Sequence, residues 1–250
     1  ASITYDCPQL EHILAPTYGC IVYQEQVMQI VRDLAGYTMG RSDLVRRAMS
    51  KKKSAVMEQE RKNFVYGNPQ EGVKGCVAKG IDEKVANQIY DEMIDFAKYA
   101  FNKSHAAAYA VVAYQTAYLK YYYPLEFMAA LMTSVMDNVT KVSEYILTCR
   151  QVMNIAILPP DINEGESGFS VSEGAIRYGL SAIKSVGRSV VEVIVEEREQ
   201  NGPFRSMEDF VGRMSNKEVN RRTLENFIKS GALDNLAGTR KQKMAVMPAS

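Results

Sequence analysis

Residues 101–109, with the sequence FNKSHAAAY, combine residue types that can hold an anion at the start of a helix. Ser104 is expected as the N-cap, because its hydroxyl can accept a hydrogen bond from a free backbone N–H group of the first turn. Lys103 and His105 flank it, next to the positive end of the helix dipole, where phosphate groups bind favourably. The alanines that follow are small, so another molecule can approach closely. The pattern predicts a phosphate site; a helix start that binds nothing is the alternative.

A second stretch with chemical potential is RSDLVRRAMSKKK, residues 41–53, which has six basic residues among thirteen. Ser42 is expected to cap a helix that ends near Met49, with apolar residues along one side of it. The basic side chains available for phosphate are Arg46, Arg47, Lys51, Lys52 and Lys53. For the three lysines, a solvated helix end is the alternative interpretation, since cations are favoured there in any case.

These stretches need helices to position them, and hydrophobic periodicity predicts a mostly α protein. Seven helices are expected at about 23–34, 42–49, 54–66, 82–100, 106–123, 125–135 and 139–152. Gly36 and Gly67 are expected to end two of them, Asp82 to cap another, and Pro124 to stop the helix that begins near residue 106.

The helix at 106–123 is apolar on nearly every side, which predicts that it is buried. Its many tyrosines are then core or interface residues. Tyr109 and Tyr114 begin nearest the predicted phosphate site, and we expect these two to take part in binding there.

The pattern changes after residue 152. Residues 155–160 read as a short strand followed by Pro-Pro, and 168–171 with 175–178 suggest a small hairpin around Glu173-Gly174. A domain boundary is expected within 160–179, so the chain divides into a multi-helix domain at 1–160 and a second unit at 161–250.

The second unit is expected to hold a small β element and two helix–hairpin–helix segments. "GLSAIKSVGRSVVEVIVEER" and "NRRTLENFIKSGALDNL" each resemble this motif, which grips phosphates through hairpin backbone N–H groups. The first departs from the glycine–apolar–glycine pattern, because Ser185 stands before Val186 where the leading glycine is usual. The second, Ser230-Gly231-Ala232, is looser still, so either hairpin could be structural rather than binding. The expected DNA-binding residues here are Lys184, Gly187, Arg188, Arg221 and Arg222.

Charged residues are distributed unevenly along the chain. The charge is segregated: residues 41–79 carry ten Lys/Arg against four Asp/Glu, 80–178 carry seven against twelve, and 179–250 carry twelve against nine. Two basic segments around an acidic one predict polyanion contacts from two places.

Four cysteines without CxxC spacing favour free thiols over disulfides or zinc. No apolar run reaches the length of a membrane span, and Ala1 in place of Met suggests a piece of a larger protein. Asp91 and Asp95 are four residues apart, but they lie off the apolar stripe, so a metal site is rejected.

Three long segments together resemble a known family. "YQEQVMQIVRDLAGYTMGRSDLVRRAMSKKK", "FNKSHAAAYAVVAYQTAYLKYYYPLEFMAALMT" and "LPPDIN" are similar to the fingers region of the C-family DNA polymerases, the bacterial DNA polymerase III alpha subunits. The resemblance runs from about Leu14 to about Leu236. It implies a fragment of a DNA-directed DNA polymerase of bacterial chromosome replication, in which the fingers cover the incoming nucleotide and helix–hairpin–helix segments contact DNA.

The resemblance also implies roles for the residues above. Arg46 and Arg47 would hold the triphosphate, with the field of the three lysines nearby. Lys51, Lys52 and Lys53 would also contact DNA. Lys103 and His105 would sit at the nucleotide pocket, His105 near the sugar. The catalytic carboxylates that hold Mg²⁺ would belong to a palm domain outside this chain, so no catalytic residue or metal ligand is expected here and the isolated fragment should be inactive.

The implied partners are primer–template DNA, the incoming dNTP, the palm and other domains of the parent polymerase, and possible contacts with a sliding clamp and other replisome proteins, in the cytoplasm at the nucleoid and not at a membrane. Two alternatives from other classes remain: a non-enzymatic module that binds duplex DNA, and a domain that docks other replication proteins.

Overall fold

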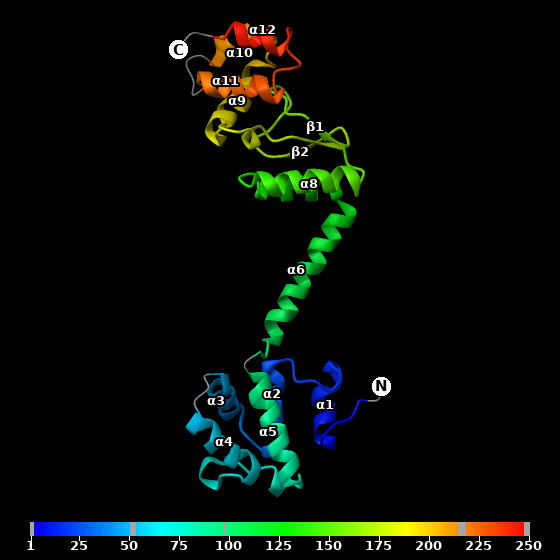
Figure 1. Ribbon diagram of the computed structural model, residues 1–250, viewed down its shortest axis with the longest axis vertical. Coiled ribbons are helices and arrows are strands. Elements are labelled where there is room, and N and C mark those ends of the chain that lie inside the picture. Colours follow the sequence, from blue (N-terminus) through cyan, green and yellow to red (C-terminus); the bar gives the residue numbers. More distant parts are fainter. Residues whose placement is uncertain (1–2, 51–53, 98, 215–218, 248–250) are drawn as a thin grey trace. The chain divides into compact units, whose positions relative to one another are not determined.

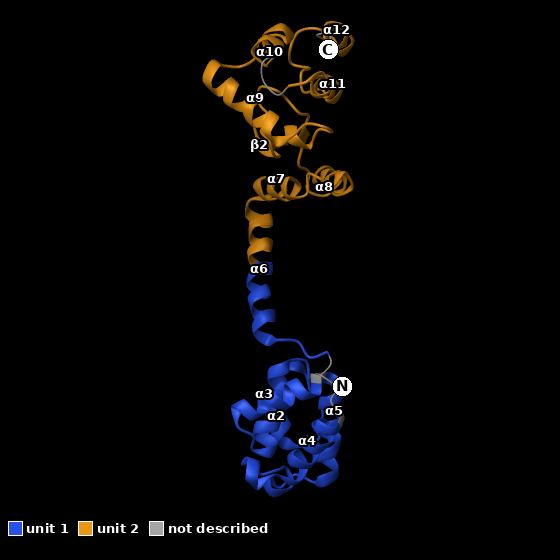
Figure 2. Cartoon of the chain, turned by 90° about the vertical axis from the view of Figure 1, so that its left-hand side faces the viewer, with its two compact units in different colours: residues 1–113 blue, residues 114–250 orange. Residues whose placement is uncertain are grey.

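The computed structural model describes residues 3–50, 54–97, 99–214 and 219–247, and it is mostly helical, with twelve α-helices and three short strands among those residues. The predicted fold class is confirmed. The chain forms two compact units, residues 1–113 and 114–250 (Figures 1 and 2). This division falls inside one helix, whereas the sequence suggested 160/161 from a change in pattern. The assignment of 1–160 and 161–250 to separate domains stays a prediction.

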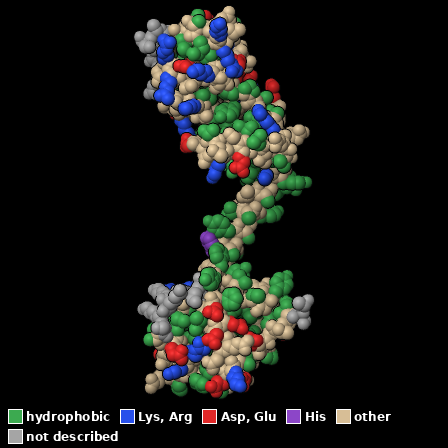
Figure 3. Space-filling view, in the orientation of Figure 1, with side chains coloured by type: hydrophobic (Ala, Val, Ile, Leu, Met, Phe, Trp, Pro, Cys, Tyr) green, Lys and Arg blue, Asp and Glu red, His purple; other side chains and the backbone are tan. Residues whose placement is uncertain are grey.

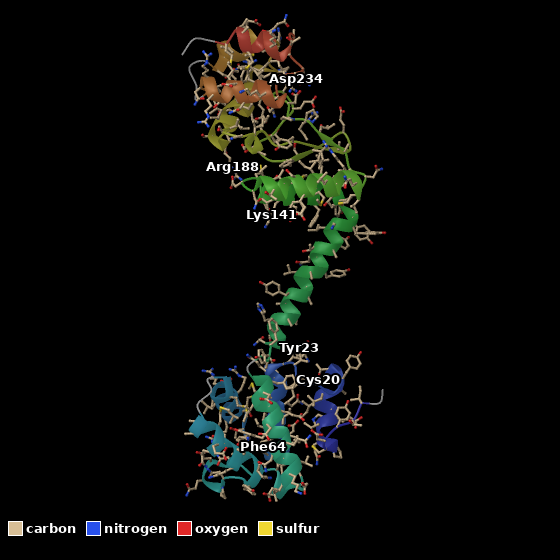
Figure 4. The ribbon with its side chains drawn as sticks, viewed as in Figure 1. Cys20, Tyr23, Phe64, Lys141, Arg188 and Asp234 are labelled. Carbon is tan, nitrogen blue, oxygen red and sulfur yellow. The ribbon has the colours of Figure 1, made fainter. Side chains whose placement is uncertain are left out.

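The first unit is a helical cluster around a single core. Its elements are η1 (Pro8–Leu10), α1 (Glu11–Leu14), η2 (Ala15–Thr17), α2 (Gln24–Ala35), α3 (Met39–Ser50), α4 (Ser54–Tyr66), η3 (Pro69–Glu71), η4 (Val77–Lys79), α5 (Glu83–Ala97) and the first part of α6 (Lys103–Tyr122). Helix α2 buries Ile30, Val31 and Leu34 completely, as its period predicts, and Gly36 ends it with a φ of 78°. Phe64 of α4 is fully buried in the same core (Figure 4).

Two helix starts differ from the predicted ones. Thr38 caps α3, because its Oγ1 accepts a hydrogen bond from the backbone N–H of Arg41 at 3.3 Å, whereas Ser42 lies inside the helix and is fully buried. Asn102 caps α6, because its Oδ1 accepts from the N–H of His105 at 2.8 Å, and Ser104 is an exposed residue of the first turn. Each helix begins earlier than predicted because a second cap-forming residue precedes it.

The predicted burial of α6 is wrong: none of its residues is buried. A helix with apolar residues on every side is buried only if other elements surround it. Among the residues that the structure describes, no element covers α6 in this way. Its tyrosines stay exposed and pack along the helix, with ring centroids 6.4 Å apart for Tyr114–Tyr118 and 4.5 Å for Tyr118–Tyr122. Figure 3 shows apolar side chains on the surface of this helix. Pro124 begins the next helix, as predicted.

The second unit begins with helices packed against a small sheet. After the last part of α6, its first elements are α7 (Pro124–Ser134), α8 (Val139–Gln151), β1 (Ile157–Leu158), β2 (Ser170–Ser172) and β3 (Ala175–Arg177). The hairpin predicted around Glu173-Gly174 is confirmed, since β2 and β3 pair antiparallel across that turn. Strand β1 pairs parallel with β3, which gives the order β1-β3-β2.

The rest of the second unit is a second helical core. It contains η5 (Leu180–Ala182), α9 (Arg188–Asn201), α10 (Met207–Met214), α11 (Arg221–Ser230) and α12 (Arg240–Ala245). Leu180, Val191 and Phe227 are among the residues that are completely buried in it.

The LPPDIN segment joins the sheet to these helices. Asp161 is 3% exposed, and its carboxylate accepts hydrogen bonds from the backbone N–H of Asn163 at 2.7 Å and from the side chain of Asn235 after α11. Asn163 in turn exchanges two hydrogen bonds with the backbone of Phe204, at 2.7 and 2.9 Å. Because buried polar groups are costly when unpaired, this network fixes the segment, and its role is structural.

Candidate nucleotide and nucleic-acid sites

The two arginines of α3 share one carboxylate. Asp43 Oδ1 accepts from Arg46 Nε and Nη2 at 3.0 and 2.7 Å, and Asp43 Oδ2 pairs with Arg47 Nε at 2.7 Å. The hydrogen bond from Arg46 is the main cause that holds the pKa of the Asp43 carboxyl below its ordinary value. Asp43 was not among the predicted site residues, although its i, i+3 and i, i+4 spacing to the two arginines could have indicated the contact.

Arg46 is also tied to the start of α2. Its Nη1 donates to Gln24 Oε1 at 3.2 Å, and its side chain is only 20% exposed. The side chain of Arg47 is 63% exposed. Asp43 and Gln24 hold the guanidinium of Arg46 in one direction, and a lysine could not reproduce this planar geometry.

The start of α6 lies against the same end of α2. Phe101 O accepts from Gln24 N, and Phe101 N donates to Val22 O, both at 3.0 Å. The Lys103 ammonium is 5.7 Å from the centre of the Tyr23 ring, whose position near the start of α6 can be followed in Figure 4. The structure therefore brings Arg46 of α3 and Lys103 of α6 to the start of α2, where they contact Gln24 and Tyr23.

One feature of the predicted phosphate site differs from expectation. The Lys103 N–H donates to Glu25 Oε2 at 3.0 Å, so a carboxylate of this chain already occupies the start of α6. The backbone N–H of His105 donates a hydrogen bond to Oδ1 of Asn102, the N-cap residue. A phosphate ligand would consequently meet the side chains of Lys103 and His105 rather than these two backbone groups.

Aromatic rings surround His105. Its ring centre is 5.4 Å from that of Phe101 and 4.6 Å from that of Tyr109, and Tyr109 is 62% exposed. Tyr114 does not join this cluster. Nine residues, roughly two and a half helical turns, separate Tyr114 from His105, so the two side chains leave α6 in opposite directions. The predicted binding role of Tyr114 has no support from this geometry.

The first hairpin of the second unit has strained backbone at the position that the motif usually gives to glycine. Ser185 has a φ of 61°, in the left-handed region, and is exposed. Val186 beside it is 6% exposed, and its N–H donates to Ile183 O at 3.1 Å. Gly187 is the N-cap residue of α9, and Arg188 is its first residue (Figure 4). Both, with Lys184, are exposed and accessible to a ligand.

The second hairpin packs against α12 of the same unit. Gly231 has a φ of 89°, and a side chain there would meet Arg240 Nη2 at 2.6 Å. Arg240 pairs with Asp234 and donates to Lys229 O at 3.1 Å. The Ser230-Gly231-Ala232 turn is thus built for packing against α12. Arg221 and Arg222 lie at the opposite end of α11, both exposed, after the cap formed by Asn220.

An open groove of about 1080 Å³ brings the two hairpin segments together. Residues 181–187 line one part of it, and Asn226, Lys229 and Ser230 line another. The turn between α7 and α8 contributes Met136 and Asp137, while Val139 is the first residue of α8. Arg188 of α9, labelled in Figure 4, follows the lining residue Gly187 in the chain. The side chains of Lys184 and Lys229 are the cations on its walls.

Several other predictions concern metals, cysteines and membranes. Lys51, Lys52 and Lys53 lie outside the described residues. All four cysteines are free thiols, and Cys20 is the exposed one. Asp91 accepts from Arg61 at 2.5 Å. Within the described ranges, no three His, Cys, Asp or Glu side chains gather as a group that could hold a metal ion. None of the helices that the structure describes combines the length and apolar character needed to cross a bilayer.

Basic side chains on α3 and at the start of α6, together with a groove lined by two lysines, are typical of proteins that bind phosphate groups. Residues 1–72 match the family model described as the bacterial DNA polymerase III alpha subunit finger domain. Residues 154–243 match a model of the helix-hairpin-helix motif. The chain is homologous to the finger and helix–hairpin–helix segment of bacterial DNA polymerase III alpha subunits.

Individual relatives support this assignment. The DNA polymerase III subunit alpha of Pasteurella multocida is 49% identical over 240 residues, which cover 94% of this chain and 20% of the relative. That of Chlamydia trachomatis is 46% identical, with coverages of 98% and 19%, and that of Thermus aquaticus is 47% identical, with coverages of 90% and 18%. The chain thus spans about a fifth of the length of the curated relatives that it matches.

Proposed function

We propose that this chain supplies the fingers and an adjoining DNA-binding region of a DNA-directed DNA polymerase of bacterial chromosome replication. The observation that carries the proposal is the position of Arg46, whose guanidinium is oriented by Asp43 and Gln24 beside the start of α6. Nucleotidyl transfer requires preorganised positive groups that hold the triphosphate while charge develops on it. The finger-domain match over residues 1–72 includes both arginines.

The incoming dNTP is the proposed ligand of the first unit. Arg46 and Arg47 bind the triphosphate, and Lys103 adds positive charge from α6. His105 lies near the sugar, with Tyr109 packed against it at 4.6 Å between ring centres. Glu25 accepts the backbone N–H of Lys103, so the Lys103 ammonium is not part of that contact.

The catalytic centre itself is proposed to lie outside this chain. The two-metal chemistry of nucleotidyl transfer needs clustered carboxylates. The described residues offer no such cluster, so they do not fit as the ligands of Mg²⁺. We assign the metal ligands to a palm domain of the parent polymerase. The other proposed partners are primer–template DNA, a sliding clamp and further replisome proteins, and the proposed location is the cytoplasm.

The test is to place these 250 residues in a full-length DNA polymerase III alpha subunit in exchange for its own segment. The exchanged enzyme is expected to extend a primer with Mg²⁺ and dNTPs, and the same enzyme with Arg46 and Arg47 both changed to Ala is expected to need much more dNTP. The isolated chain is expected to incorporate nothing. Magnesium-dependent incorporation by the pure chain, abolished by changing an acid within it, would contradict the proposal.

A second candidate is a DNA-binding module with no role in nucleotide selection. The groove and the helix–hairpin–helix match over residues 154–243 favour it. The two candidates differ in the kinetics of the exchanged enzyme. Under the second candidate, the change of both arginines leaves the dependence on dNTP concentration as it was and alters only DNA affinity and its dependence on salt.

A further inference from the structure

The groove between residues 181–187 and the end of α11 has two kinds of lining. Ile183, Val186 and Met136 are among its apolar lining residues, and the first two are buried. Lys184 and Lys229 are exposed cations that line it from two separate segments. A nucleic-acid strand alternates an apolar sugar face with a charged phosphate, so its surface is complementary to a groove of this composition.

The cationic lining continues beyond the groove. Arg222, Asn226 and Lys229 follow one another at i, i+4 and i+7, so they share one face of α11. On the other wall, Arg188 comes directly after Gly187, which lines the groove. In the face shown in Figure 3, Lys and Arg side chains are numerous on the second unit.

The Lys229 ammonium is held at its place by Glu225, one turn earlier on α11. The hydrogen bond from Lys229 is the main cause that lowers the pKa of the Glu225 carboxyl. The backbone at this end of α11 is fixed as well, because Arg240 donates to Lys229 O at 3.1 Å. The backbone that carries Lys229 is therefore held by Arg240 of α12.

We propose that this groove holds one strand of DNA, with its phosphates contacted by Lys184 from the first hairpin segment and by Lys229 and Asn226 from α11. The inference rests on the proposed function, in which the second unit binds the DNA backbone, and it adds the path of the strand and the two residues of α11. It also identifies an opposing group: Asp137 lines the groove and repels the phosphates.

That repulsion gives a test in which the variant gains function, so that misfolding cannot imitate the result. Asp137→Asn in the 250-residue chain is expected to bind a fluorescein-labelled oligonucleotide roughly threefold more tightly at about 0.1 M salt, where charges within about 10 Å still interact. The matched control is Glu173→Gln, at the exposed β2–β3 turn away from the groove lining. It removes the same charge and is expected to leave the affinity unchanged.

A loss-of-function pair completes the experiment. Lys229→Gln is expected to weaken binding and to reduce the slope of log affinity against log salt by about one unit, the value expected when a single phosphate is no longer neutralised. Lys241→Gln removes an exposed cation of α12 that does not line the groove, and it is expected to change neither quantity.

The outcomes separate this inference from the proposed function. If Asp137→Asn and Lys229→Gln behave like their controls while a Lys184→Ala, Arg188→Ala variant binds DNA less well, the strand does not lie in the groove and only the groove proposal is overturned. If that hairpin variant also binds normally, DNA binding by the second unit is overturned as well. A gain for Asp137→Asn together with a loss for Lys229→Gln supports the groove.

Discussion

Asp43 Oδ1 accepts two hydrogen bonds from the guanidinium of Arg46, at 3.0 and 2.7 Å, three residues further along α3. The same carboxylate pairs with Arg47 through its other oxygen. Asp43 therefore sets the direction of the guanidinium groups of both proposed triphosphate ligands.

Arg46→Lys or Arg47→Lys in the exchanged full-length polymerase is expected to impair nucleotide use. Lysine keeps the charge but loses the bidentate geometry, and a hydrogen bond to a charged group contributes about 1.5–3 kcal/mol. A penalty of about 2 kcal/mol corresponds to roughly thirtyfold in kcat/KM for dNTP. Steady-state kinetics against dNTP concentration measure it.

Thermal melting and DNA affinity of the same variants serve as the controls, and both are expected to stay near the parent values. Normal dNTP kinetics for both lysine variants would remove the arginines from the nucleotide site. A variant that no longer folds would instead mean that the Asp43 and Gln24 contacts of Arg46 are structural.

Asn102→Ala is expected to destabilise the start of α6 by about 1 kcal/mol, the usual cost of losing an N-cap. Its Oδ1 accepts the N–H of His105 at 2.8 Å, and alanine leaves that group unpaired. Ser104→Ala is the matched control: Ser104 lies inside the first turn, so its replacement is expected to cost much less. Urea unfolding followed by circular dichroism compares them, and a larger destabilisation by Ser104→Ala would restore Ser104 as the cap.

Lys184→Ala combined with Arg188→Ala is expected to make DNA binding less dependent on salt. Each phosphate that the protein no longer neutralises reduces the slope of log affinity against log salt by roughly one unit. Both side chains are exposed beside the first hairpin. Lys79→Ala with Lys84→Ala, two exposed cations of the first unit, is the charge-matched control. An unchanged slope in the first variant would make the hairpin purely structural.

Ser185→Gly is expected to stabilise the chain by about 0.5–1 kcal/mol. A residue with a side chain at a φ of 61° is strained by about 1–2 kcal/mol, and part of the relief is offset by the greater freedom of glycine in the unfolded chain. Ser189→Gly, in the first turn of α9, is the control and is expected to destabilise, because glycine is a poor helix former. Denaturant midpoints measure both, and equal or lower stability of Ser185→Gly would show that the turn carries no strain.

The sequence by itself determined where most elements lie. The period of α2 and its stop at Gly36, the end of α6 before Pro124, and the β2–β3 turn at Glu173-Gly174 were all predictable, because each depends on residues adjacent in the chain. The motif strings also identified the family, since long specific segments carry that information without any structure.

Only the tertiary structure decided how distant segments meet. Glu25 of α2 accepts a hydrogen bond from the backbone N–H of Lys103, and residues 181–187 line the same groove as the end of α11. Neither relation follows from local spacing. Helix α6 was predicted to be buried and is exposed. An apolar pattern indicates that burial of the helix would be favourable. Whether another element covers the helix depends on how the chain packs in three dimensions.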